Sequence, residues 1–254
     1  MLKTNKYYNV VIAMIVATIL VRGANSLRPI KNMGDKSLED SIPSVINNVV
    51  HIRNITGSCQ GSGVLIAPDL ILTARHVVED SDEFIITTND GKKYNSNSAI
   101  SSKKYDLGFI KLTTTIKCTT KIGDINDCRL GQSVFAIGSP FGDINQNSVT
   151  AGIVSSLARK LENFGCPESY GWSCIFQTDA AGHPGNSGCP VYTLDGKVRG
   201  ILVSGYSNAL IYCIPAKLIV NDCQVIQLMF LMNDYYLEQK NQEYYDGCLY
   251  NWKY

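Results

Sequence analysis

Short apolar runs separated by turn signals are the feature that most constrains the fold of this chain. There are about a dozen of them, they are rich in β-branched residues, and Asp-Gly pairs interrupt the series at 90–91 and 195–196. The second pair lies between two runs, as a hairpin turn would. Strands this short and this closely spaced are typical of sandwiches and barrels, so the sequence predicts an all-β protein. The runs are 45–52, 63–67, 70–73, 84–88, 107–112, 133–137, 149–157, 175–177, 190–192, 198–204 and 210–214.

A serine flanked by small residues, in Gly185-Asn186-Ser187-Gly188, has the composition of a tight turn that carries a nucleophile. Glycines let the backbone bend, keep the serine hydroxyl exposed and turn backbone N–H groups toward an oxyanion. The motif is weak evidence by itself, because turn residues cluster by chance in loops.

His76 and Asp106 precede Ser187 in the chain, which gives the order His, Asp, Ser. Chymotrypsin-type double barrels use this order, and the subtilisin and α/β-hydrolase orders differ from it. Taken singly, His76 is more often a structural or surface residue, Asp106 a charge at a strand edge and Ser187 a turn former. Together they predict a catalytic triad.

Four segments around these residues resemble the HtrA/Deg-type serine proteases, a trypsin-like family. The resemblance covers roughly residues 58–220. It implies a chymotrypsin-like double barrel of two six-stranded antiparallel β-barrels. The matching segments are 61–78 for the histidine region, 105–112 for the aspartate strand, 131–142 with 149–155 for the start of the second barrel, and 177–190 for the nucleophile loop.

The resemblance assigns roles to the triad. Ser187 would attack the scissile carbonyl, His76 would take its proton and return it to the leaving amine, and Asp106 would fix the imidazole tautomer. The backbone N–H groups of Gly185 and Ser187 are the predicted oxyanion donors. No cofactor is expected. A zinc site is not expected either, because the chain has no Cys-x-x-Cys and its three histidines are scattered.

The residues expected to bind the substrate side chain are uncharged. By the resemblance, Ala181 lies near the base of the specificity pocket, and Val203, Ser204 and Gly205 belong to one wall. An acid there would select Lys or Arg, so its absence predicts uncharged, aliphatic side chains before the cleaved bond. Gly182 replaces an aliphatic residue usual in the family and is expected to enlarge the space.

Other departures from the family pattern are Cys189 in place of a second glycine and Arg75 before the histidine. These departures are expected to affect substrate preference more than the catalytic triad. His183 duplicates no triad role and is expected to be a loop or subsite residue. Asn186 stands where digestive-type zymogens carry the acid that pairs with a new N-terminus, so we expect no activation of that kind.

Both ends of the chain differ from its middle. Lys3 and Lys6 precede an apolar run at 10–21, which predicts a signal peptide over 1–26, with an uncleaved signal anchor as the alternative. A signal peptide implies a protein that is secreted or lies in a periplasm-like compartment. No stable membrane association is expected after cleavage. An N-terminal arm is expected over 27–44 and the protease domain over 45–215.

Residues 216–254 are expected to form a C-terminal helix and a Tyr-rich tail. Apolar residues recur at helical spacing over 216–237, and Pro215 stands where a helix start tolerates proline. The helix would pack on the second barrel or bind a partner. The segment is too short for the PDZ domain that family members often carry, so a protease domain alone is expected.

The net charge and the cysteine content limit which partners and which cellular compartment are expected. A net charge of +1 gives no electrostatic footprint for nucleic acid, so protein or peptide substrates are the expected partners. Nine cysteines in an exported chain favour some disulfides, and the odd number leaves at least one thiol unpaired. Cys118 with Cys128, and Cys166 with Cys174, are near enough in sequence to close small loops.

Three functions compete on these observations. The leading one is a secreted serine endopeptidase that acts through an acyl-enzyme intermediate. The second is a catalytically silent binding protein that keeps the protease fold. The third is an esterase that uses the same triad. The resemblance also leaves a homo-oligomer open, because family members often form trimers.

Overall fold

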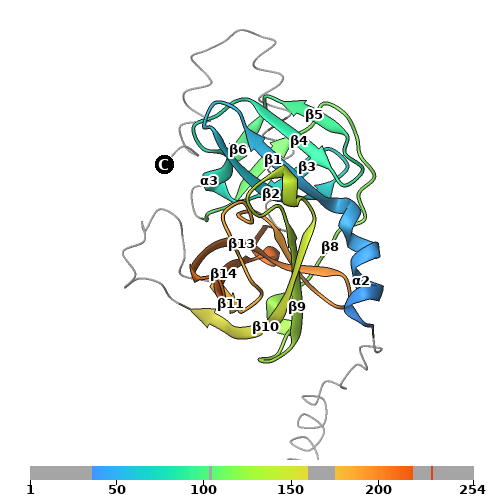
Figure 1. Cartoon of the computed structure of the whole chain (residues 1–254), viewed down its shortest axis with the longest axis vertical. Helices are drawn as coiled ribbons and strands as arrows, with labels where there is room; N and C mark the ends of the chain where they lie inside the picture. The colour runs from blue at the N-terminus through green and yellow to red at the C-terminus, as the bar shows by residue number, and fades with distance from the viewer. Residues whose placement is uncertain (1–35, 103–104, 160–174, 220–229, 231–254) are drawn as a thin grey trace, which may run out of the picture. The chain divides into compact units, whose positions relative to one another are not determined.

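The protein is described here by a computed structural model, which describes residues 36–102, 105–159, 175–219 and 230 (Figure 1). All of them belong to one compact unit. The expected signal peptide, most of the expected C-terminal helix and the Tyr-rich tail lie outside the described residues. None of the helices in the described part of the chain is long and apolar enough to cross a membrane.

The first described element is a short helix, α2 (Leu38–Val45), within the segment expected to be an N-terminal arm. Its start is fixed by a capping box: the Asp40 N–H donates to the Ser37 hydroxyl, and the Ser37 N–H donates to the Asp40 carboxylate. Ser41 then donates its hydroxyl to Leu194 O at 2.7 Å, which anchors the helix to the turn at 194–196.

Strands of the first sheet run in the order β5-β4-β1-β2-β3-β7-β6 and are all antiparallel (Figure 1). The sheet curls but does not close. Its strands are β1 (Val49–Asn54), β2 (Cys59–Ala67), β3 (Leu70–Thr73), β4 (Phe84–Thr88), β5 (Lys93–Ser96), β6 (Ala99–Ser101) and β7 (Gly108–Lys111), and helix α3 (Arg75–Val78) follows β3.

The second sheet closes on itself. Six strands follow one another in the order β12-β9-β10-β11-β14-β13, and β13 pairs back to β12. A seventh, β8, adds to β13 in parallel. The strands are β8 (Lys121–Ile122), β9 (Ser133–Gly138), β10 (Ser148–Arg159), β11 (Ile175–Thr178), β12 (Pro190–Thr193), β13 (Lys197–Ser207) and β14 (Leu210–Pro215).

The expected pair of six-stranded barrels is therefore confirmed for the second sheet only. In the first, β5 and β6 are the two edges of the sheet and do not pair with each other, although only residues 97–98 connect them. A side-chain hydrogen bond links the two ends of this sheet instead. The Ser96 hydroxyl at the end of β5 donates to Lys111 O on β7 at 2.6 Å.

The expected C-terminal helix over 216–237 also needs correction where it is described. Residues Ala216–Ile219 form a single 3-10 turn directly after β14. Phe230 is helical and fully buried, and the remainder of that segment lies outside the described residues. Short 3-10 segments elsewhere are η1 (Ile46–Asn48), η2 (Ile125–Asp127) and η3 (Asp143–Asn145).

The five cysteines in the described residues are all free, so the expected pair of Cys118 with Cys128 is not formed. These two lie in different hydrophobic clusters: Cys118 packs against the larger cluster, which includes residues of both sheets, and donates to Leu65 O, whereas Cys128 belongs to the smaller cluster in the second barrel. Cys166 and Cys174 lie outside the described residues.

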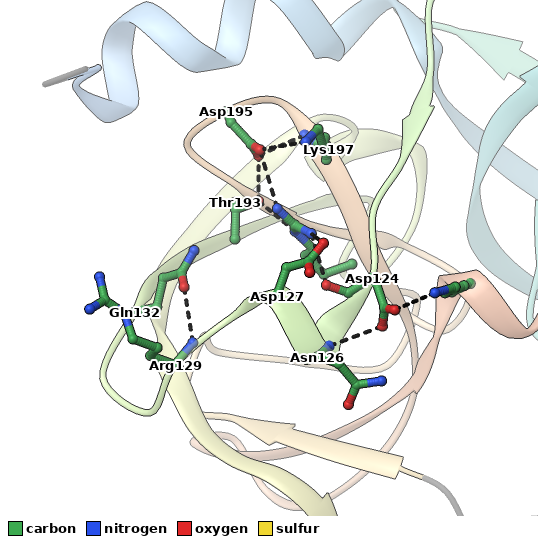
Figure 2. Close-up of polar contacts among 10 residues, drawn as sticks. Asp124, Asn126, Asp127, Arg129, Gln132, Thr193, Asp195 and Lys197 are labelled. Carbon is green, nitrogen blue, oxygen red and sulfur yellow. Dashed lines mark hydrogen bonds and ion pairs between the residues drawn. The ribbon is translucent and has the colours of Figure 1, made fainter. Parts of the chain in front are cut away.

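The buried guanidinium of Arg199 links several segments of the second barrel. Arg199 on β13 donates to the Asp124 carbonyl at 2.8 Å, to Thr193 Oγ1 at 2.9 Å and to Asp195 Oδ2 at 3.2 Å (Figure 2). Lys217 pairs with the Asp124 carboxylate, and this hydrogen bond lowers the pKa of Asp124. The network ties β12, β13 and the chain before η2 together, away from the candidate site.

Candidate active site

His76 and Asp106 meet because their strands are neighbours. Strands β3 and β7 pair antiparallel with Thr73 opposite Gly108, so the segment that follows β3 and the segment that precedes β7 lie at the same end of the strand pair. His76 Nδ1 is 2.8 Å from Asp106 Oδ2, and the His76 backbone N–H donates to Asp106 Oδ1 at 3.1 Å. The carboxylate is 1% exposed and the imidazole 35%. A buried carboxylate on Nδ1 leaves Nε2 as the ring nitrogen free to exchange a proton.

Gly108 permits this approach. A Cβ at this position would lie 2.5 Å from Val78 Cγ2 and 3.1 Å from Ala74 O, on either side of the helix that carries His76. Any side chain at 108 would therefore push α3 away from β7 and separate His76 from Asp106.

The loop that carries Ser187 is held by the first sheet through Ser62 on β2. The Ser62 N–H donates to Ser187 O at 2.8 Å, and its hydroxyl donates to Gly185 O at 2.8 Å. The same hydroxyl accepts the Ser139 N–H at 2.9 Å. One buried serine thus joins strand β2, the end of β9 and both predicted oxyanion residues.

Two glycines bring the Ser187 loop close to the strand and helix that carry His76. A Cβ on Gly188 would lie 2.1 Å from Thr73 Oγ1, and one on Gly61 would lie 2.6 Å from Val77 Cγ2 and 2.9 Å from Ser187 O. Gly61 therefore separates the backbone of Ser187 from the residue that follows His76. The Ser187 backbone thus lies beside the strand and the helix that lead to His76, where the two sheets meet.

Residues 183–186 form a β-turn whose orientation suits an oxyanion hole. Asn186 N–H donates to His183 O at 2.9 Å, Pro184 occupies the second position, and Gly185 has φ +95° at the third. A positive φ there is the signature of a type II turn, with proline favoured just before it. The Pro184 carbonyl accepts the Phe141 N–H at 2.7 Å, which directs the Gly185 N–H of the same peptide the opposite way.

The two predicted oxyanion donors are free to bind a ligand. Within the described part of the chain, neither the Gly185 N–H nor the Ser187 N–H donates to a protein acceptor, although both residues are held by their carbonyls. Backbone N–H groups without protein acceptors are donors of the kind that can stabilise developing negative charge on a carbonyl oxygen.

Two of the predicted substrate-binding residues, Ala181 and Gly182, are held by hydrogen bonds with one other strand and with a hairpin. Thr150 Oγ1 on β10 donates to Ala181 O at 2.9 Å, and the Gly182 N–H donates to Asn208 O at 3.0 Å in the β13–β14 hairpin. Val203 is buried, Ser204 half-buried and Gly205 exposed.

The space beside Gly182 is not open, contrary to expectation. The Ile211 side chain of β14 fills it, since a Cβ on Gly182 would lie 2.8 Å from Ile211 Cδ1. Sequence reasoning missed Ile211, which reads as an ordinary core position of a strand. His183, expected to be a loop or subsite residue, places its ring against Phe141 with centroids 5.5 Å apart.

Comparison with known proteins agrees with this geometry. The family model described as "Trypsin-like peptidase domain" matches residues 61–201. A probable periplasmic serine endoprotease, DegP-like, from Halomonas elongata is 41% identical over 142 residues, which is 56% of this chain and 28% of that protein. Its counterpart from Pseudomonas fulva is 42% identical over the same shares. This chain thus spans only 28% of the length of these relatives.

Solved structures give the same result. The HtrA-type protease AlgW with a tripeptide has a TM-score of 0.66 and 27% identity, covering 75% of this chain and 63% of that one. A serine endoprotease from Yersinia pestis has a TM-score of 0.61 and 26% identity, covering 74% of this chain and 65% of that one. This chain therefore belongs to the trypsin-like peptidase family, and its relatives are serine proteases of the HtrA/DegP type.

Proposed function

We propose that this protein is a serine endopeptidase that hydrolyses peptide bonds through Ser187, His76 and Asp106. The observation that carries the proposal is the contact between His76 Nδ1 and the buried Asp106 carboxylate, at 2.8 Å, beside a serine loop held against the same sheet. A serine hydroxyl is a poor nucleophile at its own pKa and needs an adjacent base oriented by a third group.

The reaction follows from these roles. Ser187 Oγ attacks the carbonyl carbon of the scissile bond while His76 Nε2 takes the hydroxyl proton. Asp106 accepts the Nδ1 proton in a hydrogen bond and stabilises the imidazolium that forms. His76 then gives its proton to the leaving amine, and the ester on Ser187 remains. A water molecule, deprotonated by His76, hydrolyses that ester and restores the enzyme.

The N–H groups of Gly185 and Ser187 would bind the oxyanion of both tetrahedral intermediates. Removing one such donor typically costs about 10²–10³ in rate, so the turn at 183–186 carries much of the proposed activity. Ala181, Gly182, Val203, Ser204 and Gly205 are the residues we propose to bind the substrate side chain. None is charged, which favours uncharged side chains before the cleaved bond.

The proposed setting is an exported one. The relatives are named periplasmic, and the pattern of residues 1–26 is that of a signal peptide. The domain limits proposed from sequence are 27–44 for the arm, 45–215 for the protease and 216–254 for the tail. A homo-oligomer is the assembly that the resemblance suggests, and sedimentation velocity tests it.

Proteolysis of casein and of a peptide library by the full chain and by Ser187→Ala tests the proposal. We expect cleavage by the parent and none by the variant. Equal cleavage by both would refute a role for Ser187. Faster hydrolysis of esters than of matched peptides would favour the esterase, and binding of peptides without cleavage would favour the silent binding protein.

A further inference from the structure

Helix α3, which carries His76, is a single turn of four residues, Arg75–Val78. A helix this short is not stable by itself in water, because its few internal hydrogen bonds do not offset the cost of ordering its backbone. Contacts from outside the helix must therefore fix its position. At its start, the Asp106 carboxylate accepts the His76 N–H at 3.1 Å. The contacts at its other end come from a residue that has no role in the proposed triad.

This residue is Asn54, the last residue of β1. Its Nδ2 donates to Val77 O at 3.0 Å and to Glu79 O at 3.3 Å, so the amide group serves two carbonyls where α3 ends. Carbonyls at the end of a helix have no hydrogen-bond partner within the helix. The Cys59 thiol also lies 3.9 Å from Val77 O, but a thiol is a weak donor. Asn54 therefore supplies the main side-chain hydrogen bonds to this end of the helix.

A third hydrogen bond fixes the orientation of the Asn54 amide. The Gly57 N–H donates to Asn54 Oδ1 at 2.7 Å, which turns Nδ2 toward the helix. A Cβ on Gly57 would lie 2.9 Å from both Oδ1 and Nδ2, so the backbone at 57 packs directly on the amide. Asn54 is 1% exposed. Removing a buried amide with three partners is costly, because it leaves buried polar groups without a hydrogen bond.

Val77, whose carbonyl Asn54 binds, lies between the two parts of the candidate site. It follows His76 directly in the chain. Its side chain faces the nucleophile loop, since a Cβ on Gly61 would lie 2.6 Å from Val77 Cγ2 and 2.9 Å from Ser187 O. A shift of the Val77 backbone would therefore move the imidazole relative to the carboxylate on one side and to the serine loop on the other.

We propose that Asn54 is a positioning residue for the general base: it holds the end of α3 so that His76 keeps its hydrogen bond to Asp106 and its reach to Ser187. The inference rests on the proposed function and adds to it a residue outside the triad. Misplacing a catalytic group by about 1 Å can cost about 10²-fold in rate. Because Asn54 is buried and acts through the helix, its loss affects kcat rather than KM.

The test replaces the Asn54 amide without changing its shape. Asn54→Asp keeps the acceptor for the Gly57 N–H. It loses both amide donors and places a carboxylate oxygen against the carbonyls of Val77 and Glu79. We expect kcat for one peptide to fall by about 10–100-fold and KM to change by less than about threefold. Asn54→Ala introduces no charge, so it keeps the test available if the aspartate variant does not fold, and kcat is expected to fall by about 10-fold or more.

Asn48 offers a matched control. It is also an asparagine with 1% exposure, and its amide makes comparable hydrogen bonds: Nδ2 donates to Thr119 Oγ1 at 3.0 Å, and Oδ1 accepts the Thr119 N–H at 2.9 Å. Its partner lies in the chain just before β8 and not in α3. Asn48→Asp and Asn48→Ala are expected to lower stability in urea unfolding and to leave kcat within about twofold.

Proton NMR of the resting enzyme supplies a readout that a loss of stability alone does not move. The proton in the hydrogen bond between His76 Nδ1 and the Asp106 carboxylate gives a resonance downfield of the backbone amides while this bond is intact. We expect this resonance in the parent and in both Asn48 variants. We expect it to be lost, broadened or shifted upfield in both Asn54 variants.

Labelling by a fluorophosphonate separates failure of this inference from failure of the proposed function. A parent that labels and cleaves, with folded Asn54 variants that match its kcat and its downfield resonance, overturns the positioning role and leaves the proposed function standing. An equal loss of kcat in the Asn48 variants overturns the role as well, because the effect then follows stability. A folded parent that neither labels nor cleaves overturns the proposed function, and the positioning role with it.

Discussion

The Ser62 hydroxyl donates to the Gly185 carbonyl oxygen at 2.8 Å, across the junction of the two sheets. Because the Ser62 N–H also donates to Ser187 O, one residue of the first sheet fixes the carbonyls on both sides of the nucleophile turn. The Gly185 N–H belongs to the preceding peptide, which is oriented by the hydrogen bond from the Phe141 N–H to the Pro184 carbonyl. The histidine and aspartate lie on the same sheet as Ser62, so alignment of the whole candidate site depends on this contact.

Ser62→Ala is expected to lower kcat by about 10–100-fold and to change KM by less than about threefold, because the oxyanion donors lose alignment while substrate contacts remain. Steady-state kinetics on one peptide measure this split. Ser41→Ala is a matched control, since Ser41 is also buried and bonded to Leu194 O, far from the site in the fold. Unchanged kcat in Ser62→Ala, or an equal loss in Ser41→Ala, would contradict this role.

Gly185→Ala is expected to lower kcat by about 10²–10³-fold, the usual cost of losing an oxyanion donor. An alanine there meets both a φ of +95° and the Ser139 carbonyl, 2.4 Å from the built Cβ, so the turn must change. Gly196→Ala serves as a control: its φ is +76°, but its nearest neighbour is 3.4 Å away. It is expected to cost about 1–2 kcal/mol of stability and little activity. Full activity of Gly185→Ala would exclude the Gly185 N–H as a donor.

His51 makes stability depend on pH. It is 2% exposed on β1, and burial, opposed by a hydrogen bond with Gln60, lowers the pKa of His51 below its ordinary 6.5. As pH falls below about 6.5 the unfolded chain binds a proton that the folded chain does not, so stability falls by up to about 1.4 kcal/mol per pH unit until the folded-state pKa is reached. Above about pH 6.5, His51 is neutral in both the folded and the unfolded chain, so it does not make the free energy of unfolding depend on pH.

His51→Gln is therefore expected to flatten the pH dependence of the unfolding free energy just below pH 6.5, relative to the parent. Urea unfolding at several pH values measures the difference, and carboxylates that titrate at lower pH contribute equally to both proteins. Parallel curves for the two proteins would show that His51 keeps its ordinary pKa in the folded state.

Arg199→Met is expected to lower the free energy of unfolding by about 3–5 kcal/mol, because Asp195, Thr193 and the Asp124 carbonyl lose a buried cationic partner. Lys197→Met is the matched control: it removes a more exposed cation, 42% accessible, from the same Asp195 and is expected to cost at most about 1 kcal/mol. Chemical denaturation compares them. Equal losses would mean that Arg199 contributes no more than a surface charge.

The sequence predicted the strands that follow an apolar pattern and missed those that do not. Strand β1 alternates or runs apolar over most of its length, but β5 reads Lys-Tyr-Asn-Ser and β8 has only two residues. Such short polar strands form because neighbouring strands supply the hydrogen-bonding partners of their backbone. No local sequence pattern reveals those partners. The open first sheet was unpredictable for the same reason, since its closure depends on whether β5 and β6 pair.

Within the candidate site, motifs predicted His76, Asp106 and Ser187, and pairing of β3 with β7 explains why the first two meet. Ser62 and Ile211 were not predicted. A serine in a Gly-rich strand and an isoleucine in an apolar one look ordinary, and their importance arises from contacts with residues more than 100 and about 30 positions away. Contacts of that separation are fixed by topology rather than by local sequence.

The central claim is that Ser187 is a nucleophile activated by His76, and the site of a fluorophosphonate adduct tests it most directly. Mass spectrometry of the labelled and digested full chain is expected to find one adduct, on Ser187, with none in Ser187→Ala and labelling at least about 100-fold slower in His76→Ala. An adduct on another serine, equal labelling of His76→Ala, or no adduct on the folded parent would contradict the account.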